Sequence, residues 1–227
     1  EKDISVFSNP MVESVFEFGS IVKPLTISAG IDASVIKPET KYDDKGFVYL
    51  SEKRIENHDH KVMGLVDMQT VIDNSLNTGA VFVMQKLGRD KFRNYMEAFG
   101  LGKKTGIDIP SETFGLVNNL KSKYEIDYAT AAFGQGIALT PIGAVRALSS
   151  LANGGVLVKP RIVDRIDSGV GVLKNIETTI QGRVLKQKTV EEITRMLVHA
   201  FEHGLLGGMY KIKQYSIAAK TGTAEIP

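Results

Sequence analysis

The chain has 227 residues, 43% of them hydrophobic, which is enough to bury one sizeable core, and no low-complexity segment divides it. Lys and Arg number 28 against 26 Asp and Glu, so the charge balance gives no reason to expect a nucleic-acid partner. The absence of cysteine excludes a disulfide framework and a Cys-based zinc site. No apolar run reaches the roughly 18 residues that cross a bilayer, and residues 1–15 do not resemble a signal peptide, so we expect the chain as given to be one soluble domain.

The first elements along the chain are a helix and a pair of strands. Residues 20–31 are predicted to form a buried helix that opens directly after Gly19. Residues 40–57 are rich in β-forming side chains around the turn-forming stretch 43–46. We therefore expect a small hairpin whose turn lies at 43–46.

The middle of the chain is predicted to be helical. From residue 66 to 99 the apolar positions recur at helical spacing, and the interruptions at 74–77 and Gly88 divide this stretch into three helices. A further helix is expected to begin at Thr140-Pro141, a capping residue followed by proline, and to end at the glycines of 153–155.

The last third of the chain combines strands with one helix. Residues 156–167 alternate enough to be strand material, and the sequence 189–192 resembles a capping box that opens a helix running to about His203. Residues 215–223 are short and β-branched, so we expect a strand there.

A serine and a lysine at the start of the first helix form a candidate catalytic pair. Ser20 and Lys23 stand three residues apart, so their side chains share one face of the helix. A serine hydroxyl needs a base, and a lysine can act as that base when burial lowers its pKa. The helix N-terminus would also favour an oxyanion formed when Ser20 attacks a carbonyl.

Two further polar groups follow in the same order as a known set of catalytic motifs. Ser75 and Asn77 lie on the expected turn between two helices, and Lys220-Thr221-Gly222 lies on the last expected strand. An S-x-x-K motif, a serine motif on a turn and a K-T-G strand together are typical of penicillin-binding proteins and class A β-lactamases. The order of these motifs is more specific than any one of them.

Each of the two outer motifs also occurs a second time. Ser34 and Lys37 form another S-x-x-K match, but they follow the helix and precede Pro38, so no helix start would hold the pair together. The second K-T-G, at residues 104–106, lies in a predicted loop. We expect neither copy to be part of the site.

Beyond these motifs the sequence resembles the transpeptidase domain of class B penicillin-binding proteins. The segments that carry the resemblance are 17–24, 100–112, 133–137 with 140–141, 152–155 and 219–224. The resemblance implies an α+β penicillin-binding transpeptidase or serine β-lactamase-like fold, with a helix-rich subdomain and part of an antiparallel sheet. Residues 1–227 would be one transpeptidase catalytic domain, incomplete at its N- and C-terminal ends.

The resemblance also implies roles for individual residues. Ser20 would form an acyl-enzyme with a stem peptide ending in D-alanyl-D-alanine, Lys23 would take and return the proton, and Ser75 would relay it to the leaving amine. The remaining expected site residues would bind substrate or set the electrostatics of the site: Asn77, Lys220, Thr221, Gly222 and Thr223. Neither a cofactor nor a metal is implied.

The same resemblance implies partners and a location. Peptidoglycan stem peptides would be cross-linked by an incoming amine, and β-lactam antibiotics would acylate Ser20. A membrane glycosyltransferase and the division or elongation machinery are expected partners of the intact protein. It would be anchored in the bacterial cell membrane with its catalytic domain on the periplasmic side.

Two alternative functions and several plainer interpretations remain open. A serine β-lactamase shares the acylation step but needs an activated water, and the sequence offers no convincing deacylating glutamate. A non-catalytic β-lactam sensor or divisome scaffold would retain Ser20 and Lys23. The histidines and paired carboxylates are expected to be ordinary surface, turn and cap residues: His58, His60, His199, His203, Asp43-Asp44 and Glu191-Glu192.

Overall fold

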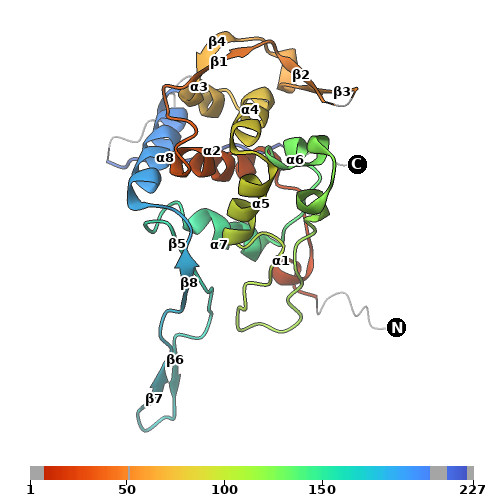
Figure 1. Ribbon diagram of the computed structural model, residues 1–227. Helices are drawn as coiled ribbons and strands as arrows, with labels where there is room; N and C mark the ends of the chain where they lie inside the picture. The colour runs from red at the N-terminus through yellow and green to blue at the C-terminus, as the bar shows by residue number, and fades with distance from the viewer. Residues whose placement is uncertain (1–7, 51, 205–213, 224–227) are drawn as a thin grey trace.

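The computed structural model describes residues 8–50, 52–204 and 214–223, and in it the helices pack around one central helix, α2 (Figure 1). The helices are α1 Pro10–Glu13, η2 Gly19–Val22, α2 Lys23–Asp32, η3 His58–His60, α3 Met68–Asp73, α4 Asn77–Leu87, α5 Arg89–Ala98, η4 Asn118–Lys121, α6 Glu125–Ala131, α7 Pro141–Ser149, α8 Gln187–His199 and the π-helical η5 Ala200–Gly204. The strands are β1 Lys41–Asp44, β2 Phe47–Leu50, β3 Lys53–Glu56, β4 Gly64–Asp67, β5 Val156–Val158, β6 Arg165–Asp167, β7 Val172–Asn175 and β8 Ile180–Arg183. This mixture of helices and antiparallel strand pairs is the α+β class predicted from the sequence.

The central helix α2 is buried on almost every side, and most of its residues are apolar or small. The predicted helix at 20–31 is confirmed, with a first turn, η2, in the tighter 3₁₀ form. Gly30 lies where a Cβ atom would come within 2.6 Å of Val83 Cγ1, so α2 and α4 approach closely at this position. The helix that carries Lys23 is therefore fixed from several directions.

The C-terminal end of α2 is tied to α8 and α5 by a buried aspartate. Asp32 Oδ1 accepts hydrogen bonds from the Lys186 amide at 2.7 Å and the Thr189 hydroxyl at 2.9 Å, and Oδ2 accepts one from the Tyr95 hydroxyl at 2.8 Å. The capping box predicted at 189–192 is therefore wrong. α8 begins earlier, at Gln187, and the Thr189 hydroxyl serves a distant carboxylate instead of its own helix.

The hairpin predicted for residues 40–57 has different strand partners from those expected. β1 pairs with β4, whereas β2 pairs with β3, so 43–46 is not the turn of a hairpin. Asp44 explains the difference, because its buried carboxylate accepts bonds from the amides of Gly46 and Met63 and from the side chains of Asn57 and Thr78. A buried charge needs such partners, and they lie on other segments.

Replacing Asp44 with alanine is expected to destabilise the protein by about 4 kcal/mol, because it leaves several buried donors unpaired. The free energy of unfolding, measured by urea titration, checks this value. Asp43→Ala is the matched control: Asp43 is exposed, and its loss should cost no more than about 0.5 kcal/mol. Equal effects of the two changes would contradict the role given to Asp44.

The three helices predicted between 66 and 99 are confirmed as α3, α4 and α5, separated at Ser75 and at Gly88. The predicted start of α7 is also confirmed, because the Thr140 hydroxyl accepts a bond from the Gly143 amide at 3.1 Å. α7 ends at Ser149, earlier than the glycines at 153–155, and turns follow it.

The strand material predicted at 156–167 is present as β5 and β6, whose partners were not predicted. β5 pairs with β8 and β6 pairs with β7, and together they form an arm that extends away from the helices (Figure 1). The outer pair, β6–β7, carries exposed apolar side chains such as Ile166 and Leu173.

Within the described residues, no helix is long and apolar enough to cross a membrane.

The strand predicted at 215–223 is not formed. These residues have no strand pairing, and their Ala219 amide donates instead to the Leu197 carbonyl of α8 at 3.5 Å. A strand requires a neighbour for its hydrogen bonds, and in the described residues this segment lies against a helix. Ala224, the last residue of the resembling segment 219–224, lies outside the described residues.

Candidate active site

Ser20 sits on a turn whose backbone is fixed by two glycines in contact. Gly19 has a φ of 55° and donates its amide to the Gly134 carbonyl at 3.3 Å. A Cβ atom on Gly134 would lie 2.0 Å from the Gly19 carbonyl oxygen, so only glycine fits there. The turn places Ser20 in the wall of a polar pocket of about 900 Å³.

Lys23 begins α2 directly after this turn and is fully buried. Its side chain has no solvent exposure, and Nζ donates to the Ser75 carbonyl oxygen and, at 3.1 Å, to Ser75 Oγ. Burial, and then the positive charge of Lys220, lowers the pKa of Lys23 to about 6. At neutral pH this amine is therefore mostly uncharged and able to accept a proton.

No hydrogen bond joins the Ser20 hydroxyl to the Lys23 amine, although both residues are among those described. The amine is engaged by Ser75 instead. Hydrogen bonds between catalytic groups are often loose in the absence of substrate, so this geometry is compatible with proton transfer once substrate is bound.

Ser75 connects the two lysines. It occupies the turn between α3 and α4 with a left-handed φ of 55°, which is unusual for serine. Lys220 Nζ donates to Ser75 Oγ at 2.8 Å, so one hydroxyl contacts both Lys23 and Lys220. Burial lowers the pKa of Lys220 to about 8, which leaves its ammonium mostly charged at pH 7.

Asn77 and the threonines after Lys220 complete the wall of the pocket. Asn77 is the first residue of α4, and its amide Nδ2 donates to the Glu56 carbonyl at 2.8 Å, at the end of β3. Thr221 and Thr223 line the same pocket. The structure thus brings together the predicted site residues from both ends of the chain.

The contacts of Gly222 explain why the triplet that begins with Lys220 ends in glycine. A Cβ atom at this position would lie 2.5 Å from Ile21 Cγ1 and 3.0 Å from the Phe18 carbonyl oxygen. The backbone of 220–223 therefore lies directly against the Ser20 turn. A larger residue would push Lys220 away from Ser75.

The two repeated motifs lie away from the pocket. Ser34 is exposed, after the end of α2, as expected from the sequence. In the second K-T-G the Thr105 hydroxyl is buried and donates to Glu112 Oε1 at 2.5 Å, so this triplet has a structural role. Both copies are therefore excluded from the site by position.

The sequence did not reveal the role of Asn57, whose side chain supports the wall of the pocket formed by the segment after β3. Asn57 Oδ1 accepts from the amide and hydroxyl of Thr78, and Asn57 also bonds to Asp44, so the segment after β3 is locked to the start of α4 beside Asn77. The acidic turn at 43–46 was a visible signal, but its partners are distant in sequence.

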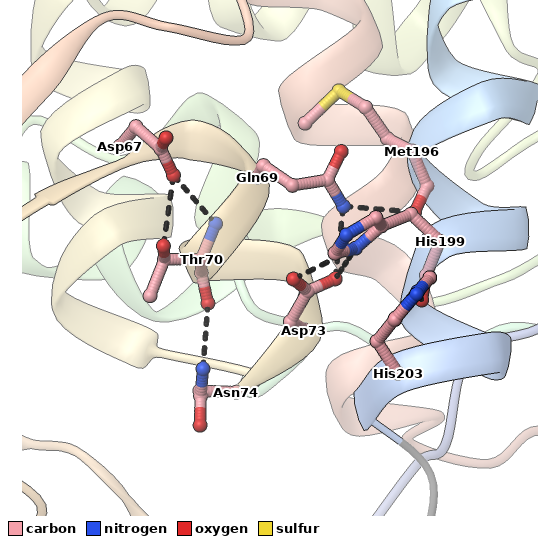
Figure 2. Close-up of polar contacts among 8 residues, drawn as sticks. All are labelled: Asp67, Gln69, Thr70, Asp73, Asn74, Met196, His199 and His203. Carbon is pink, nitrogen blue, oxygen red and sulfur yellow. Dashed lines mark hydrogen bonds and ion pairs between the residues drawn. The ribbon is translucent and has the colours of Figure 1, made fainter. Parts of the chain in front are cut away.

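His199 makes contacts that the sequence did not indicate, although its side chain is 41% exposed, as expected of a surface residue. Its Nδ1 lies 3.0 Å from Asp73 Oδ2, and its ring stacks on His203 with centroids 4.2 Å apart (Figure 2). His58 and His60 are exposed beside the pocket, as predicted.

Ser20 and Ser75 line one pocket, and two lysines donate to the Ser75 hydroxyl. Such a set of serines and lysines on an α+β scaffold is typical of proteins that form covalent acyl-enzymes on serine. Comparison with known families gives a match over residues 1–227 to the penicillin binding protein transpeptidase domain. The chain belongs to this family, which confirms the resemblance predicted from the sequence.

Individual relatives and solved structures agree with this assignment. The chain is 33% identical over 229 residues to stage V sporulation protein D of Bacillus subtilis, covering 98% of this chain and 35% of the relative. It is 28% identical to the peptidoglycan D,D-transpeptidase MrdA of Acinetobacter baumannii, covering 96% of this chain and 34% of the relative. A peptidoglycan synthetase structure from Bifidobacterium adolescentis superposes with a TM-score of 0.85 at 26% identity, covering 97% of this chain and 40% of that one.

Proposed function

We propose that this chain carries the acyl-transfer site of a peptidoglycan D,D-transpeptidase. The observation that supports this most directly is the Ser75 hydroxyl, which receives hydrogen bonds from Lys23 and Lys220 in the pocket that Ser20 lines. The chain is also similar to proteins named peptidoglycan D,D-transpeptidase. Because it spans only 41% and 34% of the length of these two relatives, the activity of the whole protein is part of the proposal.

The proposed reaction begins with proton transfer from Ser20 to the neutral amine of Lys23. The Ser20 oxygen attacks the carbonyl of the penultimate D-alanine, and the backbone amides of Ser20 and Thr223 stabilise the oxyanion. Collapse breaks the peptide bond, and the proton returns through the Ser75 hydroxyl to the leaving D-alanine amine. The product is an ester between Ser20 and the stem peptide.

The second half of the proposed reaction reverses these roles. An amine of a neighbouring stem peptide attacks the ester and Lys23 takes its proton. The ester bond to Ser20 breaks as Lys23 returns that proton to Ser20 Oγ, which leaves the amide cross-link and the free enzyme. In the first half-reaction Asn77 and Thr221 would hold the donor peptide, and Thr223 would bind its terminal carboxylate, which leaves with the released D-alanine. The charge of Lys220 favours that carboxylate and the developing oxyanion.

The ligands, partners and location of the whole protein are proposals as well. We propose that β-lactams acylate Ser20 and that the protein works with a membrane glycosyltransferase and the division or elongation machinery. It would be held at the bacterial membrane with this domain outside the cytoplasm. Residues 1–227 would form part of one transpeptidase catalytic domain, which the larger solved relatives support.

The test is turnover of a stem peptide by the full-length protein. Incubation with a donor ending in D-alanyl-D-alanine and an amine acceptor should release free D-alanine and form the cross-linked product, both read by mass spectrometry. Rapid hydrolysis of penicillin would instead support a β-lactamase. Covalent penicillin binding without release of D-alanine would support a sensor, and either of these results would overturn the proposal.

A further inference from the structure

The turn that carries Ser75 needs support from outside its own segment. It follows α3, a helix of only six residues, and a helix this short is not stable alone. The left-handed φ of Ser75 adds backbone strain, which persists only where the surrounding structure holds it. Contacts with other elements must therefore hold Ser75 where Lys23 and Lys220 meet its hydroxyl.

The N-terminal end of α3 is held locally, but its last turn is held by α8. Asp67 Oδ1 caps the start by accepting from the Thr70 amide at 2.9 Å and the Thr70 hydroxyl at 2.8 Å. Farther along, Gln69 Nε2 donates both to Asp73 Oδ1 at 2.8 Å and to the Met196 carbonyl of α8 at 3.0 Å (Figure 2). One amide thus connects the last residue of α3 to the backbone of α8.

A carboxylate and a histidine make the second connection. Asp73 Oδ2 and Oδ1 lie 3.0 and 3.2 Å from Nδ1 of His199, near the end of α8 (Figure 2). The following η5 segment packs so closely that a Cβ atom on Gly204 would lie 2.9 Å from the Asp73 carbonyl oxygen. The Asp73 side chain is 15% exposed and the His199 side chain 41%, so the carboxylate is the better shielded partner of this contact.

The connection reaches Ser75 through the backbone of α3. The Ser75 amide donates to the Ile72 carbonyl at 3.3 Å and the Leu76 amide donates to the Val71 carbonyl at 3.0 Å, on either side of Asp73 in the same helical turn. Any tilt of this last turn therefore moves the Ser75 carbonyl and hydroxyl together. Both groups are ligands of the Lys23 amine.

We propose that Asp73 and His199 are positioning residues that set the Ser75 turn for acyl transfer. The inference rests on the proposed function of Ser75 as proton relay. Within the described residues no hydrogen bond or ion pair joins His199 to Ser20 or Lys23, so its effect would pass through Asp73, which itself lines the pocket, and through α3. A displacement of catalytic groups by about 1 Å costs on the order of 100-fold in rate, so a partial loosening of the turn should be measurable.

The experiment measures acylation of the full-length protein by a chromogenic β-lactam, separating the acylation rate constant from the noncovalent dissociation constant. His199→Ala is expected to lower the rate constant about tenfold and to leave the dissociation constant within about twofold. His199→Asn keeps a donor near the position of Nδ1 and should restore most of the rate. His203→Ala removes the stacked imidazole, which has no bond to Asp73, and should behave like the wild type.

A double-mutant cycle and amide exchange complete the test. The double variant Asp73→Ala/His199→Ala should acylate no more slowly than the slower single variant, because both substitutions remove the same contact between Asp73 and His199. Exchange of the amides of 74–77, read by mass spectrometry, should become faster in His199→Ala and stay unchanged in His203→Ala. This second readout needs no acylation, so it still decides the inference if the wild type fails to react and the proposed function falls.

A purely structural role predicts a different result. In that case His199→Ala would lower the melting temperature while the rate constant per folded molecule and the exchange of 74–77 stayed at wild-type values. Strictly additive losses in the cycle, or no rescue by asparagine, would also overturn the positioning role.

Discussion

Ser20→Ala is expected to abolish covalent labelling of the full-length protein by a fluorescent penicillin. Ser20 is the serine of the S-x-x-K motif that lines the pocket containing Ser75 and Thr223. Without its oxygen no ester can form, so the loss should be complete. Intact-mass and peptide-mass measurements check the result, and the wild-type adduct should map to the peptide that contains Ser20.

The second S-x-x-K match provides the matched control. Ser34→Ala removes an equivalent hydroxyl that is exposed after α2, and labelling should stay at the wild-type level. An adduct that persists in Ser20→Ala would mean that another group is the nucleophile. An adduct lost in both variants would point to a general loss of the fold, which thermal unfolding of each variant would reveal.

Replacing Lys23 with methionine should lower the acylation rate constant about 1,000-fold, because the Ser20 proton then has no acceptor. Methionine has a similar length and is apolar, so it suits the fully buried position of Lys23. The rate constant for acylation should therefore fall, while the melting temperature should change little. Lys37→Met changes an exposed lysine of the second S-x-x-K match and should have no effect.

The pH dependence of acylation follows from the two lysines. Lys23 must be uncharged to act as base, and its pKa is lowered to about 6, so the rate should rise as the pH increases through this value. Lys220 must be charged, and its pKa is lowered to about 8, so the rate should fall again above it. A flat profile across both limbs would contradict these roles. Because the two groups interact, the measured values describe the pair.

Much of the site could be predicted from local sequence. Ser20 and Lys23 are close in the chain, so the start of one helix is sufficient to place both. The turn at Ser75 was visible as a break between two helical patterns, and the structure confirms that break between α3 and α4. The contact between Ser75 and Lys220, which are 145 residues apart, was expected only from the order of the motifs and the family resemblance.

Two of the errors share one cause, which is a polar side chain bound to a partner distant in sequence. Asp44 resembled a turn residue, yet its carboxylate organises Met63 and Thr78. Thr189 resembled a helix cap, yet it donates to Asp32 on α2. Local rules rank the possible roles of such residues, but burial decides among them, because a buried polar group must take whichever partner is within reach.

The amino-acid sequence was sufficient to determine the class of the protein, the order of the six helices α2, α3, α4, α5, α7 and α8, and the identity of the candidate nucleophile and base, but it did not reveal α1 or α6. These properties depend on short spacings and on motif order. Only the tertiary structure determined the strand partners, the unpaired conformation of 215–223 and the contact of Asp73 with His199. These depend on which segments meet in space, and the lowered pKa of Lys23 follows from the same packing, because desolvation acts only once the chain has enclosed the amine.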